Sequence, residues 1–252
     1  MSHDPQNLSK SQTASFRNLK QSKFRKQTGL FLLEGLRLCE EALNSDLEIT
    51  ACITAKNYDK IVIPEHLSRF EASQTQIEQI SDNKNPQGVI FIAKIPEATP
   101  LPAPQETKIL IVADRISDPG NLGSILRTAL WFGVKDILLG PDCVDPYNPK
   151  VVRGSMGAIA SLNIHLSDNL VTNALDWKTS EGELAALHMT GTDLNQYQPA
   201  NGLFLIIGSE AHGVSQELLS LSTPLSIKKL GQGESLNAAM ALGIALYELK
   251  RD

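Results

Sequence analysis

Short apolar runs alternate with longer, helix-like stretches throughout the C-terminal half of the chain. The apolar runs predict strands at 109–113, 136–140, 162–166, 184–189, 203–208 and 225–227. The stretches between them predict helices at 122–132, 149–160 and 235–250. Nearly continuous apolar strands separated by helices are typical of a sheet that is buried on both faces. This half therefore predicts a parallel sheet with helices on both sides.

The N-terminal half has a more mixed pattern. Leu36, Cys39, Glu40 and Leu43 share one side of a predicted helix, which follows an apolar strand beginning at Phe31. Further along, the pattern predicts strands at 49–54, 76–80 and 87–95 and a helix at 66–72. We therefore expect a small α/β domain in this half.

Four prolines, at positions 96, 100, 102 and 104, separate the two halves. This spacing cannot sustain a helix or a central strand, so it predicts a stiff, exposed linker. Residues 1–13 are polar without a hydrophobic period, which favours disorder. The predicted organisation is a disordered tail at 1–13, a small domain at 14–97, a proline-rich linker at 98–107 and a larger domain at 108–252.

Composition limits the class of protein and its cellular location. A chain of 252 residues with 42% hydrophobic content can bury a substantial core. Cys39, Cys52 and Cys143 form no CxxC pair, so we expect neither a disulfide framework nor a zinc site and infer a reducing, cytoplasmic setting. No apolar run approaches the roughly 20 residues that span a bilayer, and the first residues contain no apolar signal core. We therefore expect no membrane association.

The charge distribution is more informative than the net charge of −5. Between positions 10 and 33 the chain has no acidic residue and six cations: Lys10, Arg17, Lys20, Lys23, Arg25 and Lys26. Clustered positive charge is what contacts nucleic-acid phosphates. An ordinary solvated helix face would have the same composition, so charge alone leaves both interpretations open.

Three segments of the C-terminal half place polar residues at predicted strand-to-helix turns. After the first strand, Asn121 and Arg127 are expected beside the edge of the sheet where such folds bind ligands, although a helix cap and a surface arginine would look the same. Gly208 directly follows an apolar strand and allows close approach of a ligand, and Glu210 can hold a hydroxyl group or fix a loop. Ser235 is expected to cap the last helix.

In order, these segments resemble the motifs of the SpoU family of RNA ribose 2'-O-methyltransferases, which belong to the knotted SPOUT methyltransferases. The matching residues are Asn121, Gly123 and Arg127 in the first segment, Gly208, Glu210 and Gly213 in the second, and Ser235, Leu236 and Asn237 in the third. Ala211 and His212 stand where many relatives have a glycine after the glutamate. The resemblance implies an α/β fold in which the end of a parallel-sheet SPOUT domain forms a trefoil knot.

The same resemblance implies the chemistry of the site. S-adenosylmethionine would be held around Gly208, Ile227 and Leu236, with no metal ion required. Arg127 would be the central catalytic residue, either as the base that activates the ribose hydroxyl or as an electrostatic stabiliser of the developing alkoxide. The remaining predicted catalytic residues, which would orient the ribose and the loops, are Asn121, Glu210, Ser235 and Asn237.

The N-terminal half resembles, more weakly, the ribosomal-protein-like RNA-binding domain that precedes many SpoU catalytic domains. The resemblance depends on Glu34–Gly35 and Gln87–Gly88. With the upstream cations Arg17, Lys20, Lys23, Arg25 and Lys26, it implies a surface that binds RNA. Ribosomal RNA is the expected substrate and a homodimer the expected assembly. A transfer-RNA methyltransferase and a non-catalytic RNA-binding relative are the alternatives.

Overall fold

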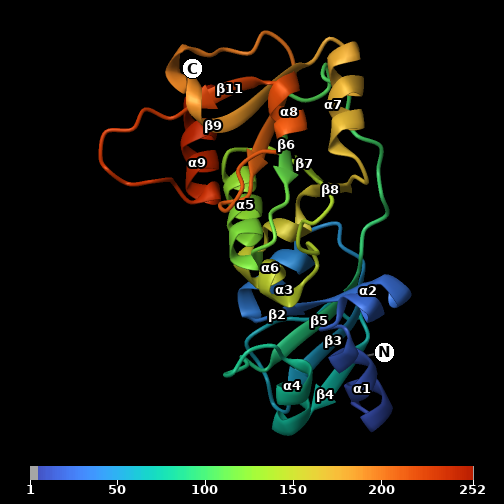
Figure 1. Cartoon of the computed structure of the whole chain (residues 1–252). Helices are drawn as coiled ribbons and strands as arrows, with labels where there is room; N and C mark the ends of the chain where they lie inside the picture. Colours follow the sequence, from blue (N-terminus) through green and yellow to red (C-terminus); the bar gives the residue numbers. More distant parts are fainter. Residues whose placement is uncertain (1–4, 252) are drawn as a thin grey trace. The chain divides into compact units, whose positions relative to one another are not determined.

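The computed structural model describes residues 5–251, which form two compact units (Figure 1). Unit 1 takes the chain up to Glu97 together with Asp145–Ser161, and unit 2 comprises Ala98–Val144 and Leu162–Asp252. The segment Asp145–Ser161, expected in the C-terminal domain, thus belongs to unit 1. Its contacts explain this placement, because Asp145 forms an ion pair with Arg25 and Tyr147 packs on Phe31.

Unit 1 has a mixed five-stranded sheet in the order β1-β4-β3-β5-β2. Strand β5 pairs with β3 and with β2 in antiparallel fashion, whereas β4 pairs with β3 and with β1 in parallel. The strands are β1 (Gln6–Asn7), β2 (Leu30–Glu34), β3 (Ile49–Ala55), β4 (Arg69–Ala72) and β5 (Val89–Lys94). The helices are α1 (Lys10–Asn18), α2 (Ser22–Thr28), α3 (Leu36–Leu43), α4 (Gln74–Ile80) and α6 (Pro149–Gly154), followed by a 3₁₀ turn, η1 (Ala158–Ala160).

Two predicted elements of unit 1 are wrong. The stretch 66–72, expected to be helical, contains strand β4, because its backbone pairs between β1 and β3. The stretch 76–80, expected to be a strand, is part of helix α4. Ser73 and Gln76 form a capping box at its start, and the buried Ile77 and Ile80 are spaced for one helix face.

The N-terminal tail is also more ordered than predicted. Strand β1 pairs with β4, and helix α1 begins at Lys10 after the N-cap Ser9. Leu8 is buried in the core of unit 1, which ties this polar stretch to the domain. The first four residues of the predicted tail lie outside the described residues.

Unit 2 has a six-stranded sheet in the order β11-β9-β10-β6-β7-β8, and all its recorded strand pairs are parallel. This agrees with the expected parallel-sheet α/β architecture. The strands are β6 (Ile109–Asp114), β7 (Asp136–Leu139), β8 (Asn163–Leu166), β9 (Glu183–Asp193), β10 (Leu203–Gly208) and β11 (Thr223–Ser226). The helices are α5 (Pro119–Trp131), α7 (Leu170–Thr179), α8 (Gln216–Leu221) and α9 (Ala238–Leu249), with a 3₁₀ turn at η2 (Leu194–Gln196).

Helices cover both faces of this sheet (Figure 1). Trp177 of α7 and Leu218 of α8 share one core with Val112 and Phe204 of the central strands. On the other face, α9 packs against β10 and α5. Successive side chains of a strand point to opposite faces, so the fully buried central strands β6 and β10 contribute to both layers.

The last helix begins later than predicted. Asn237, rather than Ser235, is the N-cap of α9, and its side-chain oxygen accepts hydrogen bonds from the backbone N–H groups of Ala239 (3.0 Å) and Met240 (3.3 Å). The segment from β11 to this cap therefore stays non-helical. It forms an exposed loop that extends away from the sheet of unit 2 (Figure 1).

Candidate active site at the carboxyl ends of the strands of unit 2

Residues just beyond the carboxyl ends of β10 and β11 line a cavity of about 660 Å³. One wall is the loop 208–214 after β10, and another is the segment 227–236 after β11. Ala238 and Ala241 of α9 contribute small side chains to the lining. Open α/β sheets bind ligands at this edge, because the loops that follow their strands gather there.

A bulge in β9 provides a further wall. The register between β9 and β11 shifts by several residues after Pro224, so 187–191 leave the regular ladder, and Leu187, His188 and Met189 line the cavity. Gly191 makes this possible, because a β-carbon there would lie 2.2 Å from the carbonyl oxygen of Pro224. The apolar run predicted a plain strand and did not indicate the bulge.

All three residues predicted to hold the cofactor line this cavity: Gly208, Ile227 and Leu236. Gly208 has a steric requirement for glycine, because a β-carbon would lie 2.1 Å from the carbonyl carbon of Gly213. Gly213 folds back onto this position through a backbone N–H bond to the oxygen of Ser209 (2.8 Å). The loop after β10 is therefore closed tightly on itself beside the cavity.

Asn237 joins the three segments singled out in the sequence. Its amide nitrogen donates to the side-chain oxygen of Asn121 (2.7 Å) at the start of α5 and to the carboxylate of Glu210 in the loop after β10. Its own oxygen meanwhile caps α9. Asn121 in turn has its backbone N–H bound by Asp118, the N-cap of α5 (2.8 Å). A single side chain thus links residues that are 116 and 27 positions away in the sequence.

The other predicted catalytic residues are placed differently. Ser235 and Glu210 line the cavity, and both are exposed. Arg127 is exposed on α5, and neither a hydrogen bond nor an ion pair engages its guanidinium within residues 5–251. It does not belong to the cavity lining. The structure therefore brings Asn121, Glu210 and Asn237 together and leaves Arg127 outside this hydrogen-bonded junction.

Asp114 is a polar residue of this region that is not among the predicted site residues. It is the last residue of β6 and is only 5% exposed, and its carboxylate accepts a hydrogen bond from the backbone N–H of Ser215 (2.6 Å). Nearby, Cys143 donates to the carbonyl oxygen of Ala113 (3.3 Å), and burial raises the pKa of its thiol, which favours the protonated donor. The signal in the sequence that could have identified Asp114 is an acidic residue placed directly after an apolar run.

Four further residues of the cavity wall carry polar chemistry that the motifs did not predict. They are His188, His212, Lys228 and Lys229. The ring of His188 forms local hydrogen bonds to the backbone of Thr190. Within 5–251, no group of three or more His, Cys, Asp or Glu side chains is arranged to hold a metal ion.

The predicted RNA-contacting cations of unit 1 fall into two groups. Arg17, Lys23 and Lys26 are exposed, and Lys20 is half-buried with its amine donating to the carbonyl oxygen of Ser81 (2.5 Å). Arg25 is the exception, because its guanidinium is 2% exposed and is held by Asp145 (2.5 Å) and by two backbone carbonyls. Burial removes Arg25 from the surface available to RNA, so we assign it a structural role instead.

Two family models match separate parts of the chain. Residues 108–247 match the SpoU rRNA methylase family, and residues 11–91 match the MRM3-like substrate binding domain. In the described part of the chain, no helix has both the length and the apolar composition needed to cross a bilayer.

Individual proteins are similar over nearly the full length. The chain is 34% identical to an uncharacterised tRNA/rRNA methyltransferase of Synechocystis, covering 93% of this chain and 89% of that protein. It is 30% identical to the 23S rRNA (guanosine(2553)-2'-O)-methyltransferase RlmP of Bacillus subtilis, covering 93% and 94%. The crystal structure of an AdoMet-bound rRNA methyltransferase from Sinorhizobium meliloti superimposes with a TM-score of 0.85 at 29% identity, covering 98% and 96%. The chain belongs to the SpoU rRNA methylase family.

Proposed function

We propose that this protein is an S-adenosylmethionine-dependent RNA ribose 2'-O-methyltransferase that acts on ribosomal RNA. The observation that carries the proposal is the junction at Asn237, where residues of all three family motifs meet at the edge of the cavity. A protein that only bound RNA would have no need for this junction beside a cavity of cofactor size.

The cavity fits the cofactor that the family uses. Its volume of about 660 Å³ lies within the roughly 300–1,000 Å³ typical of small-molecule sites. Apolar side chains from Leu225, Ile227 and Leu236 suit the faces of an adenine ring, and the tightly folded loop at Gly208 offers backbone groups to its edge. S-adenosylmethionine supplies the activated methyl group when bound.

The residues around the cavity account for the remaining requirements. Transfer to a ribose hydroxyl depends above all on alignment, and Asn237 holds Glu210 and Asn121 in a fixed arrangement for that purpose. Arg127 binds the adjacent RNA phosphate and stabilises negative charge on the ribose oxygen. A guanidinium group keeps its protons in proteins, which favours this role over that of a base.

Ribosomal RNA is the favoured substrate for two reasons. RlmP, the similar Bacillus protein, is named for action on 23S rRNA, and unit 1 matches the MRM3-like substrate binding domain. Arg17, Lys23 and Lys26 expose positive charge on this unit, as binding to RNA phosphates requires. Transfer RNA remains the second candidate, because the Synechocystis relative is named for both RNA classes.

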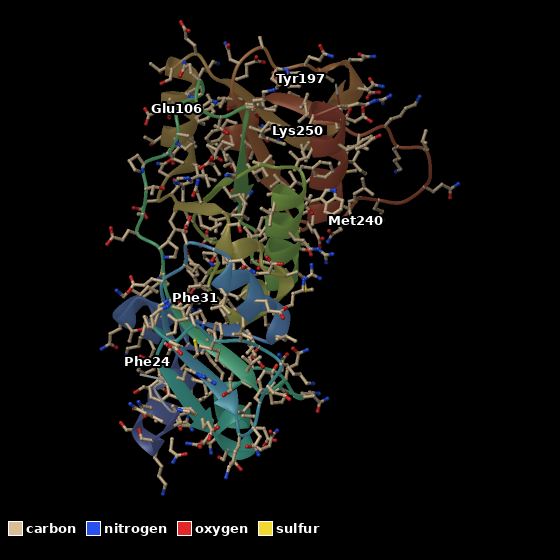
Figure 2. All side chains as sticks on the ribbon, turned by 180° about the vertical axis from the view of Figure 1, so that it is seen from behind. Phe24, Phe31, Glu106, Tyr197, Met240 and Lys250 are labelled. Atoms are coloured by element: carbon tan, nitrogen blue, oxygen red, sulfur yellow. The ribbon has the colours of Figure 1, made fainter. Side chains whose placement is uncertain are left out.

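Assembly and topology complete the proposal. Large apolar side chains are exposed on α5 and α9, which pack against each other: Leu130, Trp131, Met240, Ile244 and Tyr247 (Figure 2 labels Met240). Such a patch is unusual on a monomer, so we propose that it is the interface of a homodimer in the cytoplasm. We also propose that the segment from β11 through α9 passes through an earlier loop as a trefoil knot, as in SPOUT enzymes.

The test is methyl transfer from labelled S-adenosylmethionine to total RNA from cells that lack the enzyme. The RNA is then fractionated and hydrolysed with alkali, because a 2'-O-methylated ribose leaves a resistant dinucleotide. We expect label in ribosomal RNA with the native protein and with Lys178→Ala, an exposed cation on α7 that serves as the control. Arg127→Ala is expected to lose about 100- to 1,000-fold in kcat while still binding the cofactor.

Other outcomes would redirect the proposal. Label in transfer RNA alone would move the substrate to that class. If under-methylated RNA stays unlabelled although the protein binds it, the non-catalytic RNA-binding role replaces the enzyme. If Arg127→Ala keeps full activity, the role given to Arg127 is wrong, whatever the substrate.

A further inference from the structure

The loop 208–214 that walls the cavity is held at both ends by the carboxyl end of β6. At its start, Gly208 is the parallel-sheet partner of Asp114 in the register of β10 and β6. At its far end, the backbone N–H of Ser215 donates to the carboxylate of Asp114 at 2.6 Å. The position of the loop relative to the sheet therefore depends on one residue of β6.

Arg115 adds a second contact to the same end of the loop. Its guanidinium donates to the carbonyl oxygen of Gly213 at 3.4 Å, and its Nε lies 3.3 Å from the carboxylate of Asp114. The backbone of Arg115 has a φ of 58°, a left-handed conformation that is uncommon outside glycine and persists where surrounding contacts enforce it. The dipeptide thus contacts the oxygen of Gly213 and the nitrogen of Ser215, which flank Val214.

Neither Asp114 nor Arg115 lines the cavity, so neither is placed to touch a bound cofactor directly. Asp114 is nevertheless a carboxylate that is 5% exposed, and a buried charge is retained at a cost unless it is paired and hydrogen-bonded. Its two observed partners are the loop and Arg115. The arrangement is suited to fixing the loop rather than to chemistry.

We propose that Asp114 and Arg115 are positioning residues that hold the loop 208–214 in the conformation that binds S-adenosylmethionine. The inference rests on the proposed cofactor site. The contacts that Asp114 and Arg115 make with this loop would then determine the affinity for the cofactor and not the rate of methyl transfer.

The test is cofactor binding by isothermal titration calorimetry, which needs no RNA, at a temperature where circular dichroism shows each variant to be folded. In Asp114→Ala the Kd for S-adenosylmethionine is expected to rise about ten-fold or more, because a charge-assisted hydrogen bond to the loop is lost. Asp114→Asn keeps an oxygen that accepts from Ser215 and is expected to restore most of the affinity. Arg115→Ala, which removes the weaker contact, is expected to raise the Kd about three-fold.

Asp136→Ala is the matched control. Asp136 is a partly buried carboxylate at the opposite, amino end of β7 in the same sheet, where it accepts from Asn163 and lies 3.2 Å from the ring of His165. It is expected to lower stability without changing the Kd for the cofactor. In turnover assays, Asp114→Ala is expected to raise KM for the cofactor while kcat at saturating cofactor stays within about three-fold of the native value.

A native Kd in Asp114→Ala overturns the inference, and so does an equal loss of affinity in Asp136→Ala, which would indicate a general effect of stability. If Asp114→Ala does not fold, an unchanged Kd in Arg115→Ala overturns it. Failure of the native protein to bind the cofactor at all would remove the proposed function together with the inference. Native binding with unaffected variants would remove the inference alone.

Discussion

Replacing Arg25 tests the structural role that burial gives to this residue. Its guanidinium makes four hydrogen bonds, two to the carboxylate of Asp145 (2.5 and 3.1 Å) and two to the carbonyl oxygens of Leu19 and Lys20 (2.8 and 2.9 Å). Arg25→Ala leaves this carboxylate and both carbonyls without their cationic partner. Because Asp145 lies in the returning segment Asp145–Ser161, the contact joins two distant parts of unit 1.

The expected loss of stability follows from this geometry. Removing one member of a buried ion pair costs about 3–5 kcal/mol. Asp145 is 22% exposed and keeps hydrogen bonds from Ser22 (3.1 Å) and from the backbone N–H of Tyr147 (2.9 Å), which soften the loss. We therefore expect about 3 kcal/mol, at the lower end of that range. Such a loss is a large part of the roughly 5–15 kcal/mol that stabilises a typical protein.

Urea unfolding followed by two probes measures the effect. Both tryptophans, Trp131 and Trp177, lie in unit 2, so their fluorescence reports that unit, whereas far-UV circular dichroism reports both. In Arg25→Ala we expect an early dichroism transition that the fluorescence does not follow. Lys26→Ala, an exposed neighbour on the same helix, is the control and is expected to unfold as the native protein does.

A double-mutant cycle with Asp145→Asn isolates the pair. Each single variant is expected to destabilise unit 1. The double variant is expected to lose less free energy of unfolding than the sum of the two single losses, because either substitution alone already removes the interaction between Arg25 and Asp145. A loss below about 1 kcal/mol in Arg25→Ala, the range of exposed ion pairs, would refute the reasoning. The structural role assigned to Arg25 would then be wrong.

Three further predictions concern the site, the assembly and the response to pH. Asn237→Asp keeps an oxygen to cap α9 but removes the amide group that donates to Asn121 and Glu210. The kcat/KM of this variant is therefore expected to fall about 10- to 100-fold with little change in Tm. Unchanged turnover would show that the junction is dispensable. The double variant Trp131→Ser/Met240→Ser removes apolar surface from α5 and α9 and is expected to run as a monomer in size-exclusion chromatography with light scattering. The control Leu175→Ser, at an exposed position on α7, is expected to leave a dimer. A dimeric double variant would place the interface elsewhere. Burial raises the pKa of the Cys52 thiol from 9.0 to about 12, so the contribution of the protonated thiol to stability is complete below about pH 9 and is lost as the pH rises toward 12. The urea midpoint of the native protein is expected to fall over this window, and that of Cys52→Ala to fall less. An identical decline in both proteins would show that Cys52 is not the cause.

Much of unit 2 could be predicted from local pattern. Each of its apolar runs lies in or overlaps a strand. The runs are continuous in β6 and β10, because these strands are buried on both faces and have to be apolar along their whole length. The residues expected to hold the cofactor, Gly208, Ile227 and Leu236, line one cavity because loops after parallel strands gather at one edge. The bulge in β9 and the late start of α9 at Ala238 were not predictable, since both depend on which strands and loops are neighbours.

Unit 1 shows more clearly where prediction from local pattern fails. The exchange of helix and strand between 66–72 and 76–80 arose because short stretches with a few apolar residues fit either periodicity. Pairing of β4 between β1 and β3 decided the first, and a capping box with buried Ile77 and Ile80 decided the second.

The chain alone determined the α/β class, the order of the strands of unit 2 along the sequence and the three motif segments, because these depend on residue type and spacing within short windows. Tertiary structure decided that Asn237 joins Asn121 and Glu210, that Asp114 holds the loop after β10, and that Arg25 is buried against Asp145. Each of these contacts links residues at least 27 positions apart, and most link residues about 100 or more apart. A charged or amide side chain looks the same in sequence whether it faces solvent or a partner, and only the folded chain determines which partner it meets.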